Sequence, residues 1–272
     1  MKQPLVSVII PSYNLGQYLP EALQSVKDQT LGSWECIVVD DGSKDNSVEI
    51  ASQWAKEDER FSVTGIPNDG VHAARNKGVE LALGKYVLFL DSDDKLEPDC
   101  LENAVPVLES SPEVKIVYGL ARRFGDGIKP GIVDTPPFSM ERMLGYNCIY
   151  VTALVRRADV LAAGGFKADM EGGLEDWDLW LGVLEQGGTA LRVDKVFFSY
   201  RIRKGSRNTL ISDKKLTELR RTIWEHHKGL YAQYFFNPVE SVEYRRLDYR
   251  CKKWERFPGI RLYKFLRKLW RK

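Results

Sequence analysis

Three carboxylates follow one apolar run of this 272-residue chain, in the stretch KYVLFLDSDD at positions 85–94. Residues i and i+2 at a strand tip point to the same side, so Asp91 and Asp93 are expected to converge. Two unpaired carboxylates that close repel each other, and the pKa of one rises. A divalent cation removes this conflict, because Mg²⁺ or Mn²⁺ is held by one or two carboxylates and keeps room for substrate phosphates. Taken alone, the motif favours a simpler explanation, in which the acids cap a helix near Pro98 or solvate a turn.

Polar residues also close two other apolar runs in the first hundred residues. The sequence PSYN at 11–14 follows a β-rich run at 6–10, and Asp40 and Asp41 follow the run at 35–39. An aspartate in such a place can accept hydrogen bonds from a base or a ribose. Random surface polarity would not select the same end of three strands, so these tips are interpreted together.

The elements that position these tips follow from the spacing of apolar residues. Short apolar runs alternate with stretches of helical periodicity, which predicts a parallel sheet covered on both faces. The predicted strands are 6–10, 35–39, 61–66 and 86–90, and the predicted helices are 16–29, 46–56 and 70–83. Ligands bind outside the carboxyl ends of such strands, so a nucleotide-type site is expected there. Arg75, near the start of the third helix, is either an ordinary surface cation or the partner of a diphosphate.

The second half of the chain is less regular. Predicted strands lie at 115–118, at 152–155 and within 190–201, a loop lies at 125–137, a helix lies at 174–186, and the pattern is helical from 212 onward. The helix at 174–186 opens with three acids, Glu175, Asp176 and Asp178. One of them could be a general base for an attacking hydroxyl, but acids are also favoured at helix N-termini by the helix dipole. The residues alone do not separate the three.

Composition is that of a soluble globular protein, with 43% apolar and 29% charged residues. The longest apolar runs are too short to span a membrane. The four cysteines are widely scattered and lack metal-site spacing, which favours a reducing, cytoplasmic location.

Positive charge is concentrated at the C-terminus. Residues 250–272 carry a net charge of +9 against +2 for the whole chain, so the remainder carries −7. Residues 260–272 have the pattern of a basic amphipathic helix, which suits an anionic membrane surface on the inner face of the cell membrane. Packing on its own domain or on another subunit are the alternatives, and an oligomer is compatible with the sequence. Nucleic acid is not expected, because the rest of the chain is acidic and has no recognition motif.

Four motifs in order, VSVIIPSYN, VVDDGSKDNS, GVHAARNKG and YVLFLDSDD, resemble those of inverting glycosyltransferases of family 2. The resemblance is close over about 5–100 and continues through LEDWDLWL at 174–181 to about Arg207. It implies an α/β, GT-A (Rossmann-like) fold with a mostly parallel sheet flanked by helices, followed here by a helical C-terminal extension. It also implies a nucleotide-sugar donor, most simply a UDP-sugar, Mn²⁺ or Mg²⁺ as cofactor, and a glycan or lipid-linked acceptor in bacterial surface polysaccharide assembly.

The resemblance also implies roles for single residues. Those of the donor site are Pro11, Ser12, Tyr13, Asn14, Asp40, Asp41, Arg75, Asn76, Asp91, Ser92, Arg201 and Ser206. Asp93, with Asp91, would hold the metal, and Asp94 could lie only behind them. The general base corresponds to Asp176, and the acceptor-binding residues are Glu175, Trp177, Trp180 and Asn147. Residues 1–100 would then bind the donor, 101–210 of the same domain the acceptor, and 211–272 form the extension.

Two other functions are weighed against this one. A sugar nucleotidyltransferase on a related sheet would need a Gly-rich loop after the first strand, which PSYNLGQ lacks. A non-catalytic nucleotide-binding module would have lost its acids, whereas every expected acid is present. The histidines at 226 and 227 receive no role from the sequence.

Overall fold

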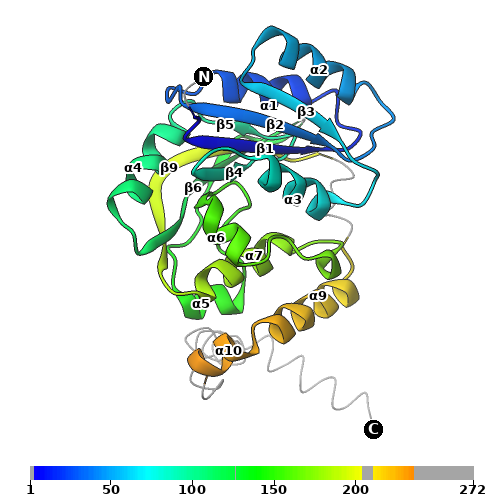
Figure 1. Cartoon of the computed structure of the whole chain (residues 1–272). Helices are drawn as coiled ribbons and strands as arrows, with labels where there is room; N and C mark the ends of the chain where they lie inside the picture. The colour runs from blue at the N-terminus through cyan, green and yellow to red at the C-terminus, as the bar shows by residue number, and fades with distance from the viewer. Residues whose placement is uncertain (1–2, 126, 204–210, 236–272) are drawn as a thin grey trace.

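The computed structural model describes residues 3–125, 127–203 and 211–235 (Figure 1). Its strands are β1 (Val6–Ser12), β2 (Trp34–Asp40), β3 (Phe61–Gly65), β4 (Tyr86–Phe89), β5 (Lys95–Leu96), β6 (Val114–Phe124), β7 (Gly131–Val133), β8 (Leu154–Arg156) and β9 (Thr189–Arg201). Its helices are α1 (Leu19–Lys27), α2 (Ser47–Glu57), α3 (Val71–Leu81), α4 (Cys100–Ser110), α5 (Met140–Gly145), α6 (Arg157–Ala162), the 3₁₀ helix η1 (Ala168–Met170), α7 (Glu175–Glu185), α9 (Asp213–His226) and α10 (Lys228–Tyr234).

The described strands form one mixed sheet in the order β3-β2-β1-β4-β8-β6-β9-β5, with β7 beside β6. The four strands predicted in the first hundred residues are all present, and β3, β2, β1 and β4 pair in parallel. Ser12 at the end of β1 lies opposite Asp40 at the end of β2, so their polar tips meet at one edge of the sheet. This confirms the α/β fold and the convergence of the strand ends.

The second half of the sheet is mixed rather than parallel. Strand β8 is antiparallel to both β4 and β6, whereas β6 and β9 pair in parallel. Several short elements lie where the sequence predicted none, among them helix α5 and strand β7, which lies within the predicted loop 125–137. Helix α4 begins close to Pro98 and contains Pro106, which interrupts the helical hydrogen bonding.

Successive residues of the buried strands pack on opposite faces of the sheet, as the period of two requires. Val8 and Ile10 pack with α1 and α4, whereas Ile9 and Phe89 pack with α3 and α7. Helix α3 lies very close to β1, because a Cβ added at Gly78 would be 2.3 Å from Ile9 Cγ2. This close contact brings the first turn of α3 to the tips of the strands.

Helices α9 and α10 belong to the C-terminal extension and lie beside α5 and α7 (Figure 1). Leu219, Ile223 and Leu230 are buried in the same core as α7, so α9 and α10 pack on the preceding part of the chain. Within the described ranges, no helix is long and apolar enough to cross a membrane. The predicted basic helix at 260–272 lies outside the described residues.

Candidate active site

Two cavities open beside the carboxyl ends of the parallel strands. The first, about 440 Å³, is lined by the tips of β1, β2 and β4, the start of α3 and the end of β9, and is called the strand-tip cavity. The second, about 490 Å³, lies between the start of α7, the residues before β8 and strand β9, and is called the α7 cavity. Arg75, Asp91, Glu175 and Tyr200 line both, so the two cavities meet at these side chains.

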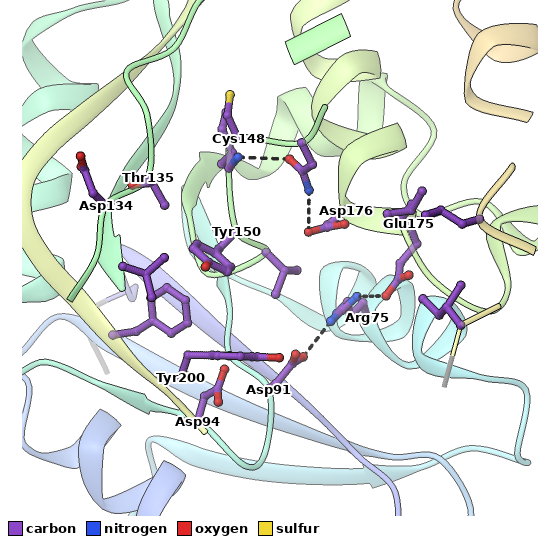
Figure 2. Close-up of a pocket in the computed structure, with 18 residues that line it drawn as sticks. Arg75, Asp91, Asp94, Asp134, Thr135, Cys148, Tyr150, Glu175, Asp176 and Tyr200 are labelled. Atoms are coloured by element: carbon purple, nitrogen blue, oxygen red, sulfur yellow. Dashed lines mark hydrogen bonds and ion pairs between the residues drawn. The ribbon is translucent and has the colours of Figure 1, made fainter. Parts of the chain in front are cut away.

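Arg75 pairs with two acids at the junction of the two cavities. Its guanidinium donates to Asp91 Oδ1 at 2.7 Å and to Glu175 Oε1 at 2.8 Å, and Figure 2 shows it between these carboxylates. The side chain is only 2% exposed. Burial opposes its charge, but Asp91 and Glu175 outweigh burial and raise the Arg75 pKa. The sequence left Arg75 as either a surface cation or the partner of a diphosphate, and the structure buries it between two acids at the junction of the cavities.

The other two acids of the DSDD stretch are held by the end of β9. Arg203 donates from Nε to Asp93 Oδ2 at 2.6 Å, and the Arg201 backbone N–H donates to Asp94 Oδ1 at 2.8 Å. Burial and the charge of Asp91 nevertheless raise the pKa of Asp93. Burial and the charges of Asp91 and Asp93 raise the pKa of Asp94 well above its usual range. Three acids thus lie together, and burial opposes the charge of Asp93 and Asp94.

Two of these acids are placed where a divalent cation could bind. Asp91 and Asp93 line the strand-tip cavity, where a cation could reach them, whereas Asp94 is almost fully buried. No set of three or more His, Cys, Asp or Glu side chains among the described residues is arranged to hold a metal. Two carboxylates are enough for an ion that takes its other ligands from a diphosphate and water.

The other residues predicted for the donor site divide into two groups. Pro11, Ser12, Tyr13, Asp41, Ser92 and Arg201 line the strand-tip cavity with the residues above. Asp41 also accepts from the backbone N–H groups of Asp69 and Gly70, at 2.8 and 3.0 Å. These bonds fix the loop that leads into α3. Ser206 lies outside the described residues.

Three of the predicted donor-site residues do not line the strand-tip cavity and bond to the backbone instead. Asn14 accepts from the Lys44 N–H, and Asp40 accepts from the Ser43 N–H, so both order the loop after β2. Asn76 donates to the carbonyl oxygen of Phe166 and accepts from its N–H. Short polar side chains of this kind bond readily to nearby backbone, which their sequence positions did not reveal.

A tight turn presents the acids of α7. Gly172, Gly173 and Leu174 all have positive φ, at 104°, 141° and 62°. Such a value is uncommon for leucine, and residues with this strain concentrate at functional sites. The turn directs Glu175 toward Arg75 and places Asp176 in the α7 cavity.

Asp176 is held by Asn147. Asn147 donates from Nδ2 to Asp176 Oδ2 at 3.0 Å and accepts the Ile149 N–H at 3.1 Å, which sets the orientation of the amide (Figure 2). The other carboxylate oxygen accepts the backbone N–H of Trp177 at 2.8 Å. The carboxylate is thus oriented in the cavity as a hydrogen-bond acceptor, the form that a general base requires. Asn147, predicted as an acceptor residue, both lines the cavity and positions this acid.

An aromatic group forms another part of the α7 cavity. Tyr150 makes an edge-on contact with Phe198 at 5.3 Å between ring centroids and lies 6.1 Å from Tyr200. All three rings line the cavity. Sugar rings bind well to such surfaces, because their C–H faces pack on aromatic carbon while their hydroxyls reach polar neighbours.

The two tryptophans predicted for acceptor binding are core residues instead. Trp177 is 3% exposed and donates its indole N–H to the Met143 carbonyl oxygen, and Trp180 is fully buried near Phe89. Neither lines either cavity. On α7 they occupy the face that packs against the sheet, so helical geometry explains the correction.

Sequence reasoning also missed residues that line the site. Arg203 lies in the basic stretch YRIRKGSR at 200–207, and nothing in the sequence showed that it pairs with Asp93. Tyr200 gained no role, although it lines both cavities. Its place at the end of a predicted strand, beside other polar tips, was the available signal.

Comparison with known proteins agrees with this geometry. The family model described as "Glycosyl transferase family 2" matches residues 7–152. The putative teichuronic acid biosynthesis glycosyltransferase TuaG of Bacillus subtilis is 34% identical over 201 residues, which are 74% of this chain and 80% of TuaG.

Two solved structures share the fold. The S. aureus TarS 1–349 structure in complex with UDP-GlcNAc has a TM-score of 0.68 at 22% identity, over 81% of this chain and 66% of that one. The mannosyltransferase PcManGT from Pyrobaculum calidifontis, in complex with GDP-Man and Mn²⁺, has a TM-score of 0.60 at 18% identity, over 97% and 84% of the chains.

Proposed function

Because the chain belongs to glycosyl transferase family 2 and has the GT-A fold, we propose that it is a metal-dependent inverting glycosyltransferase. It would transfer a sugar from a nucleotide-sugar to a hydroxyl group of a glycan or lipid-linked acceptor. The observation that carries the proposal is the meeting of two cavities at Arg75, with Asp91 on one side and the α7 acids on the other. A transferase needs this arrangement, because two substrates must meet at one reacting carbon.

The strand-tip cavity would bind the donor. Tyr13 and Asp41 line it at the end where the base would lie, and Asp91 lies where it could accept from a ribose or sugar hydroxyl. TarS, which shares the fold, binds UDP and UDP-GlcNAc, so a UDP-sugar is the donor we propose. Arg203 and Arg201, also in this cavity, would supply positive charge near the diphosphate.

Asp93, with Asp91, would hold Mn²⁺ or Mg²⁺ against the diphosphate. When bound, the ion would supply positive charge that stabilises the leaving nucleoside diphosphate. The raised pKa of Asp93, caused by burial and the charge of Asp91, supports this assignment. PcManGT, of the same fold, was solved with Mn²⁺.

The α7 cavity would bind the acceptor, and Asp176 would take the proton from its hydroxyl group. The oxygen attacks the anomeric carbon as the bond to the diphosphate breaks, so a single displacement inverts the anomeric configuration. Only one carboxylate need act in this step, and Asn147 holds Asp176 for it. Glu175, paired with Arg75, would orient the acceptor or the donor sugar at the junction of the cavities.

The name of TuaG points to cell-surface polysaccharide assembly, and we propose this setting for the chain, at the cytoplasmic face of the membrane. Residues 260–272, whose basic pattern predicted a membrane-surface contact, lie outside the described residues.

A panel of donors tests the proposed activity. The purified chain is incubated with UDP-sugars and GDP-mannose, Mn²⁺ and either glycan or lipid-linked acceptors, and release of nucleoside diphosphate is measured. Release should depend on acceptor, stop with EDTA and return with Mn²⁺ or Mg²⁺. NMR of the glycosidic product should show inversion. If none of the donors releases nucleoside diphosphate under any of these conditions, the transferase assignment is contradicted.

Replacing Tyr150 by alanine should raise the acceptor KM roughly 3- to 10-fold, since an aromatic contact is worth about 0.5–1.5 kcal/mol. The donor KM should stay unchanged, because Tyr150 does not line the strand-tip cavity. Initial rates at varied acceptor concentration measure the effect. Tyr150→Phe keeps the ring and should behave like the parent enzyme, so an equal loss in both variants would assign the effect to the hydroxyl group instead.

A further inference from the structure

A second group of charged side chains lies behind the turn that presents Glu175 and Asp176, outside both cavities. Its centre is Asp178 of α7, which is 1% exposed. Asp178 Oδ1 lies 2.7 Å from His226 Nδ1 and 3.2 Å from His227 Nε2, and Lys167 Nζ lies 3.2 Å from Oδ2. We call these side chains, with Asp169 and Glu185, the histidine cluster.

Both imidazoles have a carboxylate at each ring nitrogen. The second nitrogen of His226 lies 2.9 Å from Asp169 Oδ2, and the second nitrogen of His227 lies 3.0 Å from Glu185 Oε2. A neutral imidazole has one N–H and one lone pair, so it can satisfy only one of its two carboxylates. A protonated ring donates to both. With the three carboxylates ionised, the four contacts are therefore compatible with one another only when both histidines are charged.

The charges of the cluster balance in that state. Three carboxylates, Asp169, Asp178 and Glu185, face three cations, namely Lys167 and the two protonated histidines. The nearby Glu225 and Lys228 pair with each other, so they add no net charge.

The shifts in pKa agree with this balance. Burial lowers the pKa of His227, but hydrogen bonds to Asp178 and Glu185 outweigh it and the pKa is raised. Burial likewise opposes the charge of Asp178, whose pKa is nevertheless lowered by both histidines and by Lys167.

The cluster connects three elements that form the site. Asp169 belongs to η1 and Asp178 to α7, while His226 ends α9. At its other end α9 follows Ile211, and both Ile211 and Leu216 line the α7 cavity. The same segment packs on the positive-φ turn, since a Cβ added at Gly173 would be 2.7 Å from Ile211 Cδ1. A shift of α9 relative to α7 would therefore move both a wall of the α7 cavity and the turn before Glu175.

We propose that His226 and His227, in their protonated form, are positioning residues that fix α9 on α7 and thereby shape the α7 cavity. They touch neither proposed substrate and act through Asp178 and the turn. The kinetic part of this inference rests on the proposed transferase activity, whereas its structural part does not.

The direction of the pH effect follows from linkage. A histidine whose folded pKa is raised contributes its full stabilisation below the unfolded pKa of about 6.5 and loses it as pH rises through the folded pKa. Raising the pH should therefore loosen α9 and weaken acceptor use at the alkaline end. Leu219 and Ile223 remain buried, so the helix should shift rather than unfold completely.

Histidine NMR of the full chain tests the structural part. Only three histidines are present, so His72→Gln, His226→Gln and His227→Gln assign every imidazole resonance. His227 should titrate above about pH 6.5, and amide exchange in α9 should rise over the same range. The melting temperature should fall in H226Q and H227Q by more at pH 6 than at pH 9. Titration of His227 without a raised pKa, or a stability deficit independent of pH, would overturn the proposal.

Kinetics test the functional part. In H226Q and H227Q, kcat/KM for the acceptor should fall between about 10-fold and 100-fold near pH 7, as expected when a reacting group is displaced slightly. The donor KM should change little. The decrease in acceptor kcat/KM that the parent enzyme shows at alkaline pH should disappear in both variants. Lys214→Gln removes an exposed cation from the same helix and should match the parent. An unchanged pH profile in H226Q and H227Q would refute positioning, even if both lost stability. Absence of transfer by the parent enzyme would instead refute the proposed function and leave the NMR result standing.

Discussion

Replacing Asp176 by asparagine is expected to lower kcat by about 10²- to 10⁴-fold, the usual contribution of a general base. The substitution preserves shape and removes the carboxylate that would take the proton of the acceptor hydroxyl. Binding of the donor should remain, because Asp176 lines the α7 cavity and not the strand-tip cavity. Single-turnover transfer and titration with UDP measure the two effects separately.

Asn147→Ala is the matched test of the hydrogen bond to Asp176 at 3.0 Å. The variant keeps the Asp176 carboxylate but removes a hydrogen bond that orients it. The kcat of the variant should therefore lie between those of the parent and of Asp176→Asn. Full activity in Asp176→Asn would assign the base to another residue, of which Glu175 is the nearest in sequence. Equal losses of UDP binding and of transfer would show that the variant is damaged elsewhere.

The parallel half of the fold could be predicted because its signals are local. Each strand at 6–10, 35–39 and 86–90 is an apolar run buried on both faces, and each ends in residues that water or a ligand must satisfy. Parallel pairing then places these ends at one edge without further information. Asp41, Asp91 and Asp93 were found this way.

Other features depend on contacts between segments far apart in the chain. Arg75 and Glu175 are 100 residues apart. Whether a polar side chain contacts a ligand or the backbone also depends on partners that are distant in the sequence. Asn76 was predicted at the donor site because of its motif, but its amide binds Phe166, 90 residues away. Trp177 and Trp180 follow Glu175 and Asp176 in sequence, yet the helix places them in the core. Sequence spacing alone carries no signal of these outcomes.

The stretch KYVLFLDSDD combines local signals that the sequence reveals with distant contacts that it does not. Its apolar part predicted a buried strand, and its acids predicted a ligand site. The three aspartates nevertheless differ in surroundings. Asp91 meets a buried arginine of α3, Asp93 meets Arg203, and Asp94 is almost fully buried against the end of β9. Two of the partners, Arg201 and Arg203, lie at and just after the end of β9, more than a hundred residues later. This separation explains why the sequence left the role of Asp94 open.

Replacing Arg75 by methionine is expected to destabilise the protein by about 3–5 kcal/mol, the cost of removing one partner from a buried ion pair. Methionine approximates the length of the side chain but removes the ion pair with Glu175, which is 4% exposed. Asp91 should lose its orientation as well, so transfer should fall even in the folded fraction. Denaturant unfolding followed by fluorescence measures the first effect. Lys77→Met removes an exposed cation from the same helix and should cost at most about 1 kcal/mol.

A double-mutant cycle separates the ion pair from the packing of Arg75. If the cost arises from the carboxylate left in the protein, Glu175→Gln in the Arg75→Met background should recover part of the lost stability, because the remaining amide carries no charge. Activity should not recover, since Asp91 still lacks its partner. Additive losses in the double variant would show that the interaction of Arg75 with Glu175 contributes little. The principal role of Arg75 would then be its cation–π contact with Phe166, 5.2 Å from the ring centroid, and its contact with Asp91.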